Sequence, residues 1–306
     1  MEIYLDNSAT TKIDPDVLML MERIMEEDYG NPASLHKKGV EAEVYTRKAR
    51  GQIAKTLKCE AKNIYFTSGG TESNNWALAG AAEANRRAGM HIVTTSVEHP
   101  SVKKTLAHLE EQGYSVTYLP VDRDGVVSAQ DAEDALRDDT ILVSCMYVNN
   151  EIGAVEPVEA IGQMLHRKRP DILFHVDAIQ AYGKYVIRPG RDHIDLLSCS
   201  GHKIHGPKGT GFLYVSGRTK IRPLLYGGGQ QKGMRSGTEN VPGCAGLGLA
   251  AELTCRDIPG SAALLRDRKA QLIEGLSALP GVRFNGRTDE QSAPHILSAS
   301  FEGIRS

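Results

Sequence analysis

The chain has 306 residues, of which 41% are hydrophobic and 24% are charged, and this composition is typical of a folded globular protein rather than a disordered one. The 36 Lys and Arg residues nearly balance the 38 Asp and Glu residues, so the net charge of −2 gives no electrostatic reason to expect nucleic acid or an anionic membrane as a partner. No uncharged apolar stretch approaches the roughly 20 residues that span a bilayer, and no leader-like segment is recognisable, so we expect a soluble protein.

The cysteines are five in number, lack CxxC spacing and lie mostly in apolar runs: Cys59, Cys145, Cys199, Cys244 and Cys255. An odd number without paired spacing does not suggest a disulfide framework. We therefore expect reduced thiols that serve as small apolar fillers or surface groups, in a cytoplasm-like compartment.

From about residue 60 onwards, short apolar runs alternate with longer helical patterns, which predicts a three-layer α/β domain with a mainly parallel sheet. The predicted strands are residues 63–68, 91–95, 115–119, 140–148, 172–177 and 194–198, and the predicted helices are residues 72–88, 101–112, 157–169 and 241–255. A composition shift near residues 258–260 precedes a charged helix, 262–279, and two short strands, 282–285 and 296–301. We expect a large domain over residues 16–258 and part of a small α+β domain over residues 259–306.

The first candidate binding segment is the run Thr-Ser-Gly-Gly-Thr-Glu-Ser-Asn-Asn at residues 67–75, where a strand gives way to a glycine pair and then a helix. Such a junction offers backbone N–H groups and the Thr71 hydroxyl to a phosphate at a helix N-terminus. The alternative is a tight turn at Gly69 and Gly70 with Thr71 capping the helix. A mononucleotide P-loop is not indicated, because the GxxxxG run at residues 201–206 continues with Pro207 instead of Lys-Ser/Thr.

The second segment is the predicted strand 172–177, which ends in Asp177 and is followed by Gln180. Ligands of open α/β sheets gather at the carboxyl ends of strands, so Asp177 is a candidate ligand contact. The alternative is that Asp177 only caps the next turn. His175, inside the strand, is expected to pack in the core.

The third segment is residues 194–209, where Lys203 follows a buried-looking strand among small residues. A sequestered lysine can lose its proton and form a Schiff base, whereas most lysines are solvated. A zinc site of Cys199, His202 and His205 is the other alternative, but no second pair of ligands at matching spacing accompanies these residues.

The three segments make sense together for pyridoxal 5′-phosphate, which needs a phosphate cradle, a carboxylate at the pyridine nitrogen and a lysine at the aldehyde. Asp177 is the candidate carboxylate and Lys203 the candidate lysine. His99 follows another predicted strand, where its flat ring can stack on the cofactor and shuttle protons. The alternative for His99 is a residue that closes a turn before Pro100.

Five motifs then establish a family resemblance: Tyr-Leu-Asp-Asn-Ser-Ala-Thr-Thr at residues 4–11, Ser-Gly-Gly-Thr-Glu at 68–72, Asn-Asn-Glu-Ile-Gly at 149–153, Ser-Gly-His-Lys at 200–203 and Arg-Ser-Gly-Thr-Glu-Asn at 235–240. The chain resembles the cysteine desulfurases of the nitrogen-fixation and iron–sulfur-cluster type, in the class V aminotransferase group of fold-type-I pyridoxal-phosphate enzymes. This resemblance implies a homodimer, an N-terminal segment 1–15 near the active site and a cofactor-binding large domain 16–258.

The resemblance also implies cofactor contacts from residues spread over the chain. The phosphate is held by Gly70, Thr71, Ser200 and His202, the ring hydroxyl by Gln180, the cofactor and substrate region by Asn150, and the phosphate of the opposite subunit by Thr238. The site is thereby expected to be shared between two subunits.

The reaction implied by the resemblance removes sulfur from L-cysteine, giving alanine and an enzyme persulfide that passes to an iron–sulfur scaffold or another sulfur-acceptor protein. In the family, the nucleophilic cysteine and a substrate-gripping arginine lie beyond the motif at residues 300–303, so we expect the given chain to be C-terminally truncated and none of its cysteines to be the nucleophile. Two alternatives remain: another class V lyase or aminotransferase such as a selenocysteine lyase, and a catalytically silent dimeric binding protein. The run Gly-Thr-Glu-Asn-Val-Pro at residues 237–242 resembles the nitrogen-fixation desulfurases and favours the desulfurase over these alternatives.

Overall fold

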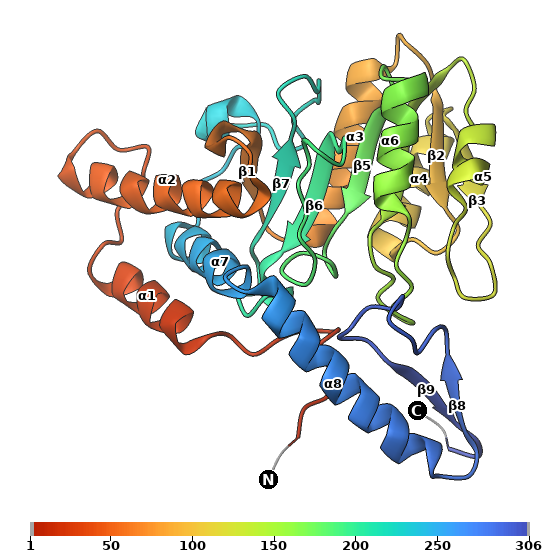
Figure 1. Cartoon of the computed structure of the whole chain (residues 1–306). Helices are drawn as coiled ribbons and strands as arrows, with labels where there is room; N and C mark the ends of the chain where they lie inside the picture. Colours follow the sequence, from red (N-terminus) through yellow and green to blue (C-terminus); the bar gives the residue numbers. More distant parts are fainter. Residues whose placement is uncertain (1–2, 305–306) are drawn as a thin grey trace.

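A computed structural model describes residues 3–304, and a seven-stranded sheet lies at its centre (Figure 1). The strand order is β1-β7-β6-β5-β4-β2-β3, and all neighbours run parallel except β7, which is antiparallel to both β1 and β6. The strands are β1 (Ile64–Thr67), β2 (His91–Thr95), β3 (Ser115–Leu119), β4 (Thr140–Met146), β5 (Leu173–Asp177), β6 (Leu196–Ser200) and β7 (Gly211–Val215). The predicted α/β class with a mainly parallel sheet is confirmed.

Helices cover both faces of the sheet. They are α1 (Pro15–Glu26), α2 (Lys37–Leu57), α3 (Gly70–Asn85), α4 (Pro100–Glu111), α5 (Ala129–Asp134), α6 (Val158–Lys168), α7 (Val241–Thr254) and α8 (Ile258–Ser277), with short 3-10 turns η1 (Ala61–Asn63), η2 (Gly201–Lys203) and η3 (Gln230–Gly233). Trp76 of α3 and Leu106 of α4 belong to the cluster on one face. Ile53 of α2, Ile161 of α6 and Leu247 of α7 belong to the cluster on the other, which gives three layers.

The central strands are buried on both faces, since every residue of β4, β5 and β6 is buried. Both faces of these strands are covered, so even their polar residues, such as His175 and Ser198, are buried and bond each other. In the register, Met146 pairs with Asp177, and Asp177 pairs with Ser198. The carboxyl ends of β4, β5 and β6 therefore meet at one edge of the sheet.

Four helices and strands were not predicted: α1, α2, α5 and β7. The buried face of α2 consists mainly of small residues such as Gly39, Ala42 and Ala49, so its helical periodicity carries little hydrophobic signal. Strand β7 follows a Gly- and Pro-containing loop and returns antiparallel, which the regular alternation of strand and helix did not anticipate. Helix α8 begins four residues earlier than predicted, with Asp257 as its N-cap and Pro259 in its first turn.

The C-terminal region consists of α8 and a two-stranded antiparallel sheet of β8 (Val282–Asn285) and β9 (Ser298–Phe301). Figure 1 shows this sheet apart from the central one, at the far end of α8. The Ala293 N–H donates to the Gly153 carbonyl oxygen (2.8 Å), which joins this region to the loop after β4. The predicted domain boundary after residue 258 falls at the start of α8 and stays a prediction.

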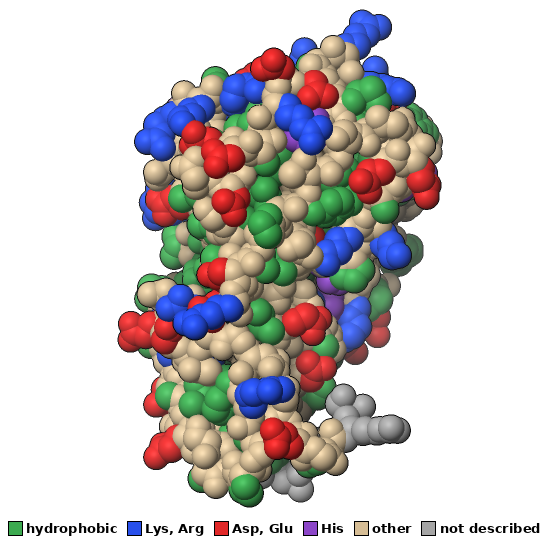
Figure 2. Space-filling view, turned by 90° about the vertical axis from the view of Figure 1, so that its right-hand side faces the viewer, with side chains coloured by type: hydrophobic (Ala, Val, Ile, Leu, Met, Phe, Trp, Pro, Cys, Tyr) green, Lys and Arg blue, Asp and Glu red, His purple; other side chains and the backbone are tan. Residues whose placement is uncertain are grey.

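In the described part of the chain, no helix combines the length and the apolar character needed to cross a membrane. On the face drawn in Figure 2, basic and acidic side chains are interspersed with each other and with apolar ones. This distribution agrees with the small net charge of the sequence.

Candidate active site

A cavity of about 430 Å³ lies at the carboxyl ends of β4, β5 and β6, where ligands of open α/β sheets bind. Its wall contains all of the site residues predicted from the sequence except Thr238: Gly70, Thr71, His99, Asn150, Asp177, Gln180, Ser200, His202 and Lys203. Asp6, Ser8 and Ala9 of the N-terminal segment also line it. The fold thus gathers at one place residues that are more than 130 positions apart along the chain.

The turn between β1 and α3 has the geometry of a phosphate cradle. Gly69 has a φ of 148°, which favours glycine, and a Cβ on Gly70 would lie 2.1 Å from Ile179 Cδ1. The first N–H groups of α3 have no partner within the helix, and the helix dipole adds positive potential at the same place. Thr71 adds a hydroxyl at the start of the helix. The small residues therefore let the backbone approach an anion closely.

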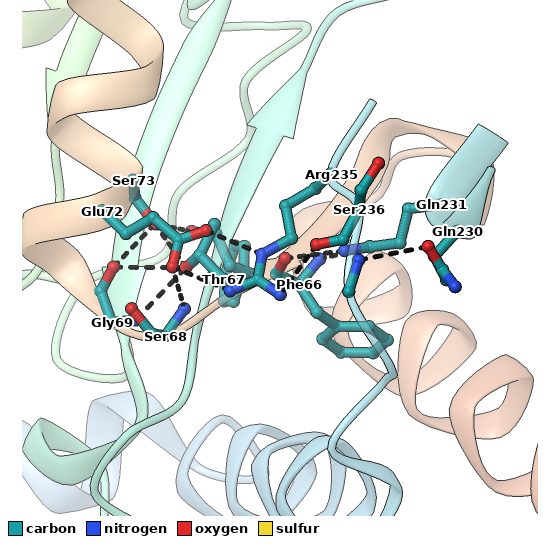
Figure 3. A network of polar contacts seen from close by, with 12 residues as sticks. Phe66, Thr67, Ser68, Gly69, Glu72, Ser73, Gln230, Gln231, Arg235 and Ser236 are labelled. Carbon is teal, nitrogen blue, oxygen red and sulfur yellow. Dashed lines mark hydrogen bonds and ion pairs between the residues drawn. The ribbon is translucent and has the colours of Figure 1, made fainter. Parts of the chain in front are cut away.

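The cradle is held in place by Glu72, which Figure 3 shows facing Arg235. Arg235 donates from Nε to Glu72 Oε1 (2.8 Å) and from Nη2 to Oε2 (3.1 Å), while the Ser68 N–H donates to Oε2 (2.8 Å). Burial raises the pKa of Glu72, but the bonds from Arg235 and Ser68 outweigh it and lower the pKa below its usual range. The charged carboxylate joins the turn, the helix and the loop that carries Arg235.

The same loop is fixed to the edge of the sheet by Gln231. Its side-chain amide accepts from the Phe66 N–H (2.7 Å) and donates to the Phe66 carbonyl (2.8 Å), as a neighbouring strand would (Figure 3). Gln230 accepts from the Gly237 N–H (3.1 Å). Thr238, next in sequence, is exposed and lies outside the wall of the cavity.

Asp177 is the last residue of β5 and is only 4% exposed. Its Oδ1 accepts from the Ile179 N–H (3.0 Å) and its Oδ2 from Asn74 Nδ2 (2.7 Å). Burial raises the pKa of Asp177, while these two bonds and the nearby His99 and Lys203 act in the opposite direction. A cation placed in the cavity against this carboxylate would favour its ionised form.

Lys203 ends the 3-10 turn η2 that follows β6. Its Nζ donates to the carbonyl oxygens of Ser8 and Ala9, the latter at 2.9 Å. Burial lowers its pKa, and Asp6 and Asp177 partly oppose this effect. A lysine with a lowered pKa has a larger neutral fraction for attack on an aldehyde.

Lys184 was missed by the sequence analysis. Its Nζ donates to the Lys203 carbonyl oxygen (2.7 Å), and burial lowers its pKa to about 8. The half-buried Lys184 side chain therefore fixes the backbone of Lys203. The only signal in the sequence was its place in the turn after Gln180, near the end of a buried strand.

The other polar residues of the wall contact the N-terminal segment or the start of α4. Gln180 Nε2 donates to the Ser8 carbonyl (2.9 Å), and His202 Nδ1 lies 3.1 Å from Thr10 Oγ1. Burial and the neighbouring lysines lower the pKa of His202 to about 4, so its ring is neutral at neutral pH. His99 is the N-cap of α4 and accepts from the Ser101 N–H at Nδ1 (3.1 Å).

The zinc alternative does not gain support from the geometry. Within residues 3–304, no group of three or more His, Cys, Asp or Glu side chains is placed to hold a metal ion. Cys199 is buried in β6, where burial raises its pKa, whereas His202 lines the cavity and His205 Nδ1 lies 3.0 Å from the Lys12 carbonyl oxygen. These three residues have separate environments.

The buried thiols and His175 have the packing roles expected of them. Cys145, Cys199 and Cys244 are buried, and none of the five free cysteines belongs to the cavity wall. Burial raises the pKa of Cys244 to about 12, so little thiolate forms. His175 is fully buried between Ser144 (2.9 Å) and Ser198 (3.0 Å), and burial lowers its pKa to about 3.

Pyridoxal 5′-phosphate fits the donor set of the cavity. A Cβ on Gly70 would clash with Ile179, so glycine is required there and the backbone N–H groups at the start of α3 stay open to a phosphate. Asp177 offers a buried carboxylate, and Lys203 an amine of lowered pKa in the same wall. Each group that the cofactor requires is therefore present.

Comparisons with known proteins decide the family. The class V aminotransferase family matches residues 3–306. A cysteine desulfurase IscS of Methanosarcina thermophila is 47% identical over 302 residues, which cover 99% of this chain and 74% of that protein. The chain belongs to the class V aminotransferases, and within them to the cysteine desulfurases. Pyridoxal 5′-phosphate is the cofactor of this family and of this chain.

Solved structures agree with this membership of the desulfurase family. A NifS-like protein superposes with a TM-score of 0.96 at 41% identity, covering 100% of this chain and 83% of that one. A structure described as SspA in complex with cysteine superposes with a TM-score of 0.87 at 36% identity, covering 98% of this chain and 84% of that one. The fold of this chain, with its central sheet, is thus that of a NifS-like protein.

Proposed function

We propose that the protein removes sulfur from L-cysteine: a cysteine thiolate attacks the substrate sulfur, the carbon–sulfur bond breaks, the carbon is protonated to give alanine, and the outer sulfur of the persulfide passes to an iron–sulfur scaffold or another acceptor protein. The attacking thiolate is not expected to be one of the five cysteines described above, none of which lines the cavity. The observation that carries this proposal is the single cavity that holds Lys203, Asp177 and the cradle at Gly70 in one wall. Relatives named as cysteine desulfurases and a similar structure described in complex with cysteine support the choice of substrate.

Bound pyridoxal 5′-phosphate supplies an electron sink for the bonds around the substrate Cα. When the cofactor is bound, Asp177 would balance the charge of the ring nitrogen, and Lys203 would supply the amine that holds the aldehyde. His99 would serve proton transfer and hydrogen bonding beside the cofactor. Asn150 and Gln180, in the same wall, would orient the cofactor and substrate.

We also propose a homodimer in which Thr238 contacts the phosphate of the partner subunit. The brace between the loop and the sheet supports this, because it holds an exposed threonine in a fixed position outside its own cavity. Large apolar side chains are exposed in the loop between α1 and α2, at Tyr29 (72%) and Leu35 (100%), and in the loop that carries Arg235, at Tyr226 (76%). A cytoplasm-like compartment is proposed from the free thiols.

The proposed domains are an N-terminal segment 1–15 at the active site, a cofactor-binding large domain 16–258 and a small-domain segment 259–306. Contacts of Ser8 and Ala9 with Lys203 support the first assignment. The change from the central sheet to the separate β8–β9 sheet supports the division between the other two.

Borohydride reduction tests the site. A Schiff base between the cofactor and Lys203 is expected to give a yellow protein, and reduction is expected to fix the cofactor to the Lys203 peptide, because hydride adds to the imine carbon. Lys208, five residues on and exposed, is the internal control. Adduct on Lys208, or no adduct, would contradict the assignment. Alanine release from L-cysteine, compared with release from selenocysteine, tests the reaction itself.

A further inference from the structure

A continuous chain of hydrogen bonds joins Asp177 to His99 beneath the cavity. Asn74 of α3 donates from Nδ2 to Asp177 Oδ2 (2.7 Å) and to Ser101 Oγ (2.9 Å). Ser101 Oγ lies 2.8 Å from His99 Nδ1, and the Ser101 backbone N–H also points to Nδ1 (3.1 Å). Asn74, Ser101 and Asp177 are all buried. Neither Asn74 nor Ser101 was singled out as a candidate in the sequence.

The direction of each bond follows from its donors. Asn74 has two amide hydrogens, and the structure directs one to the Asp177 carboxylate and the other to Ser101 Oγ. Turning the amide around would place its oxygen against the Asp177 carboxylate, so the charge fixes its orientation. Because Ser101 Oγ accepts from Asn74, its single hydrogen is free to point at His99 Nδ1.

Two hydrogens therefore converge on His99 Nδ1, one from the Ser101 hydroxyl and one from the Ser101 backbone. A nitrogen that accepts both must carry a lone pair. We propose that Asn74 and Ser101 are positioning residues that hold neutral His99 in the tautomer with its proton on Nε2. The cost of the arrangement is visible in Asn74 Oδ1, which is buried without a hydrogen-bond partner among the described residues.

This tautomer sets what His99 can do in the cavity, an inference that rests on its proposed place beside the cofactor ring. His99 lines the cavity and turns its Nδ1 edge to α4, so Nε2 is the nitrogen left for the cavity. In the neutral tautomer Nε2 carries the proton, so it donates a hydrogen bond into the cavity and has no lone pair with which to accept a proton. Giving up a proton from Nε2 would require the imidazolium, in which Nδ1 is protonated too, and the two Ser101 donors at Nδ1 oppose that form. The relay therefore holds His99 as a hydrogen-bond donor toward the cavity.

The first test is the holoenzyme labelled with ¹⁵N-histidine, studied by long-range ¹H–¹⁵N correlation. His99→Gln identifies the His99 signals by their loss. The expected spectrum has an unprotonated Nδ1 and a protonated Nε2 at pH 8. A protonated Nδ1 would overturn the proposal, and this measurement on the wild type needs no variant of the relay to fold.

Variants of α4 test whether the Ser101 hydroxyl itself, rather than the packing of its side chain, sets the tautomer of His99. Ser101→Ala removes one of the two donors, so the ratio of Nε2–H to Nδ1–H tautomer is expected to fall about 3- to 10-fold. The kcat for L-cysteine is expected to fall by a similar factor while KM stays unchanged, and Ser101→Thr should restore both. The matched control is Thr105→Ala, which removes a buried hydroxyl of the same helix that bonds only the Ser101 carbonyl (2.8 Å).

A tautomer ratio in Ser101→Ala equal to that of the wild type would overturn the role of the hydroxyl, as would an equal change in Thr105→Ala. Asn74→Leu frees Ser101 Oγ from its donor, so its spectrum should change in the same direction as that of Ser101→Ala. A wild-type spectrum in this variant would remove Asn74 from the relay. The proposed function is judged separately: its failure is the lack of alanine release by the wild type, whatever tautomer His99 adopts.

Discussion

The carboxyl edge of the central sheet and the α8–β8–β9 region are built in opposite ways. Strands β4, β5 and β6 are buried throughout and carry cavity residues at their ends. Of the 20 residues of α8, only Ala262 and Lys269 are buried, and the side chains of Leu264 and Leu272 are exposed. The groups that hold the cofactor are thus attached to strands of the packed core. The C-terminal region buries fewer side chains and contributes less to the free energy of unfolding.

The two regions meet at the loop after β4. Asn150 and Glu151 of this loop line the cavity, and Gly153 accepts a hydrogen bond from Ala293. A Cβ on Gly153 would lie 3.0 Å from Ile296 Cβ, so the contact is close. This junction gives the C-terminal region a direct path to the rim of the cavity. Because this junction is small, we expect substitutions at the carboxyl edge of the sheet to change cofactor binding and substitutions in the α8–β8–β9 region to change mainly the local stability.

The largest effect is expected from Asp177→Asn, at the carboxyl edge. An amide cannot balance the charge of a protonated ring nitrogen, and removing one member of a buried ion pair costs about 3–5 kcal/mol. We expect kcat/KM for L-cysteine to fall about 10²–10³-fold with the fold retained, which steady-state kinetics and circular dichroism would measure. Activity close to that of the wild type would show that Asp177 does not face the ring nitrogen.

The next effect concerns Glu98, a 3%-exposed carboxyl beside the cavity whose pKa burial raises to about 8. Between pH about 4.5 and 8 the folded state keeps this proton and the unfolded state does not. Stabilisation is therefore full below pH about 4.5 and is lost as the pH rises to about 8. Glu98→Gln should remove up to about 1.4 kcal/mol per pH unit from the slope of the unfolding free energy.

Denaturant titrations at pH 5 and pH 8.5 measure this slope. Relative to the wild type, Glu98→Gln should be more stable at pH 8.5 than at pH 5. Glu83→Gln, an exposed change on α3, is the control and should leave the slope unaltered. Equal slopes in Glu98→Gln and the wild type would mean that Glu98 is ionised in the folded protein.

A smaller effect is expected at the brace of the phosphate cradle. Arg235→Gln removes the cation from Glu72, a pair whose side chains are 22% and 12% exposed. The turn at Gly69 loses part of its support, so the dissociation constant of the cofactor should rise about 3- to 10-fold. Fluorescence titration of the apoenzyme measures it. Arg169→Gln, which breaks the more exposed pair with Asp171, should leave the constant unchanged.

The smallest effect on the cofactor is expected from Lys269→Met, in the C-terminal region. Lys269 Nζ donates to Ser292 Oγ (2.7 Å) and to the Ala293 carbonyl (2.9 Å), and burial lowers its pKa to about 8. Between pH about 8 and 10.5 the unfolded state binds this proton and the folded state does not, so this lysine makes stability rise with pH. The substitution should flatten that rise and leave cofactor affinity within about twofold of the wild type. A large loss of affinity would break the proposed separation of the regions.

The sequence by itself determined the class of fold and the chemical types at the site. Continuous apolar runs predicted buried parallel strands, and Asp177 and Lys203 were recognisable because each follows such a run. The cofactor was predicted from the combination of these residues and from the motifs that the chain shares with the cysteine desulfurases. Strand β7 was not predicted because its antiparallel return departs from the alternation of strand and helix. Helix α2 was not predicted because its buried face consists mainly of small residues, which give little hydrophobic periodicity.

Only the tertiary structure decided which polar side chains meet. Lys184 bonds the Lys203 carbonyl, and Asn74 bonds both Ser101 and Asp177, the latter 103 positions away in sequence. Local propensity cannot encode these contacts, because they depend on strand order and on the register that sets β4, β5 and β6 side by side. The direction of each hydrogen bond follows from that packing, and with it the tautomer proposed for His99.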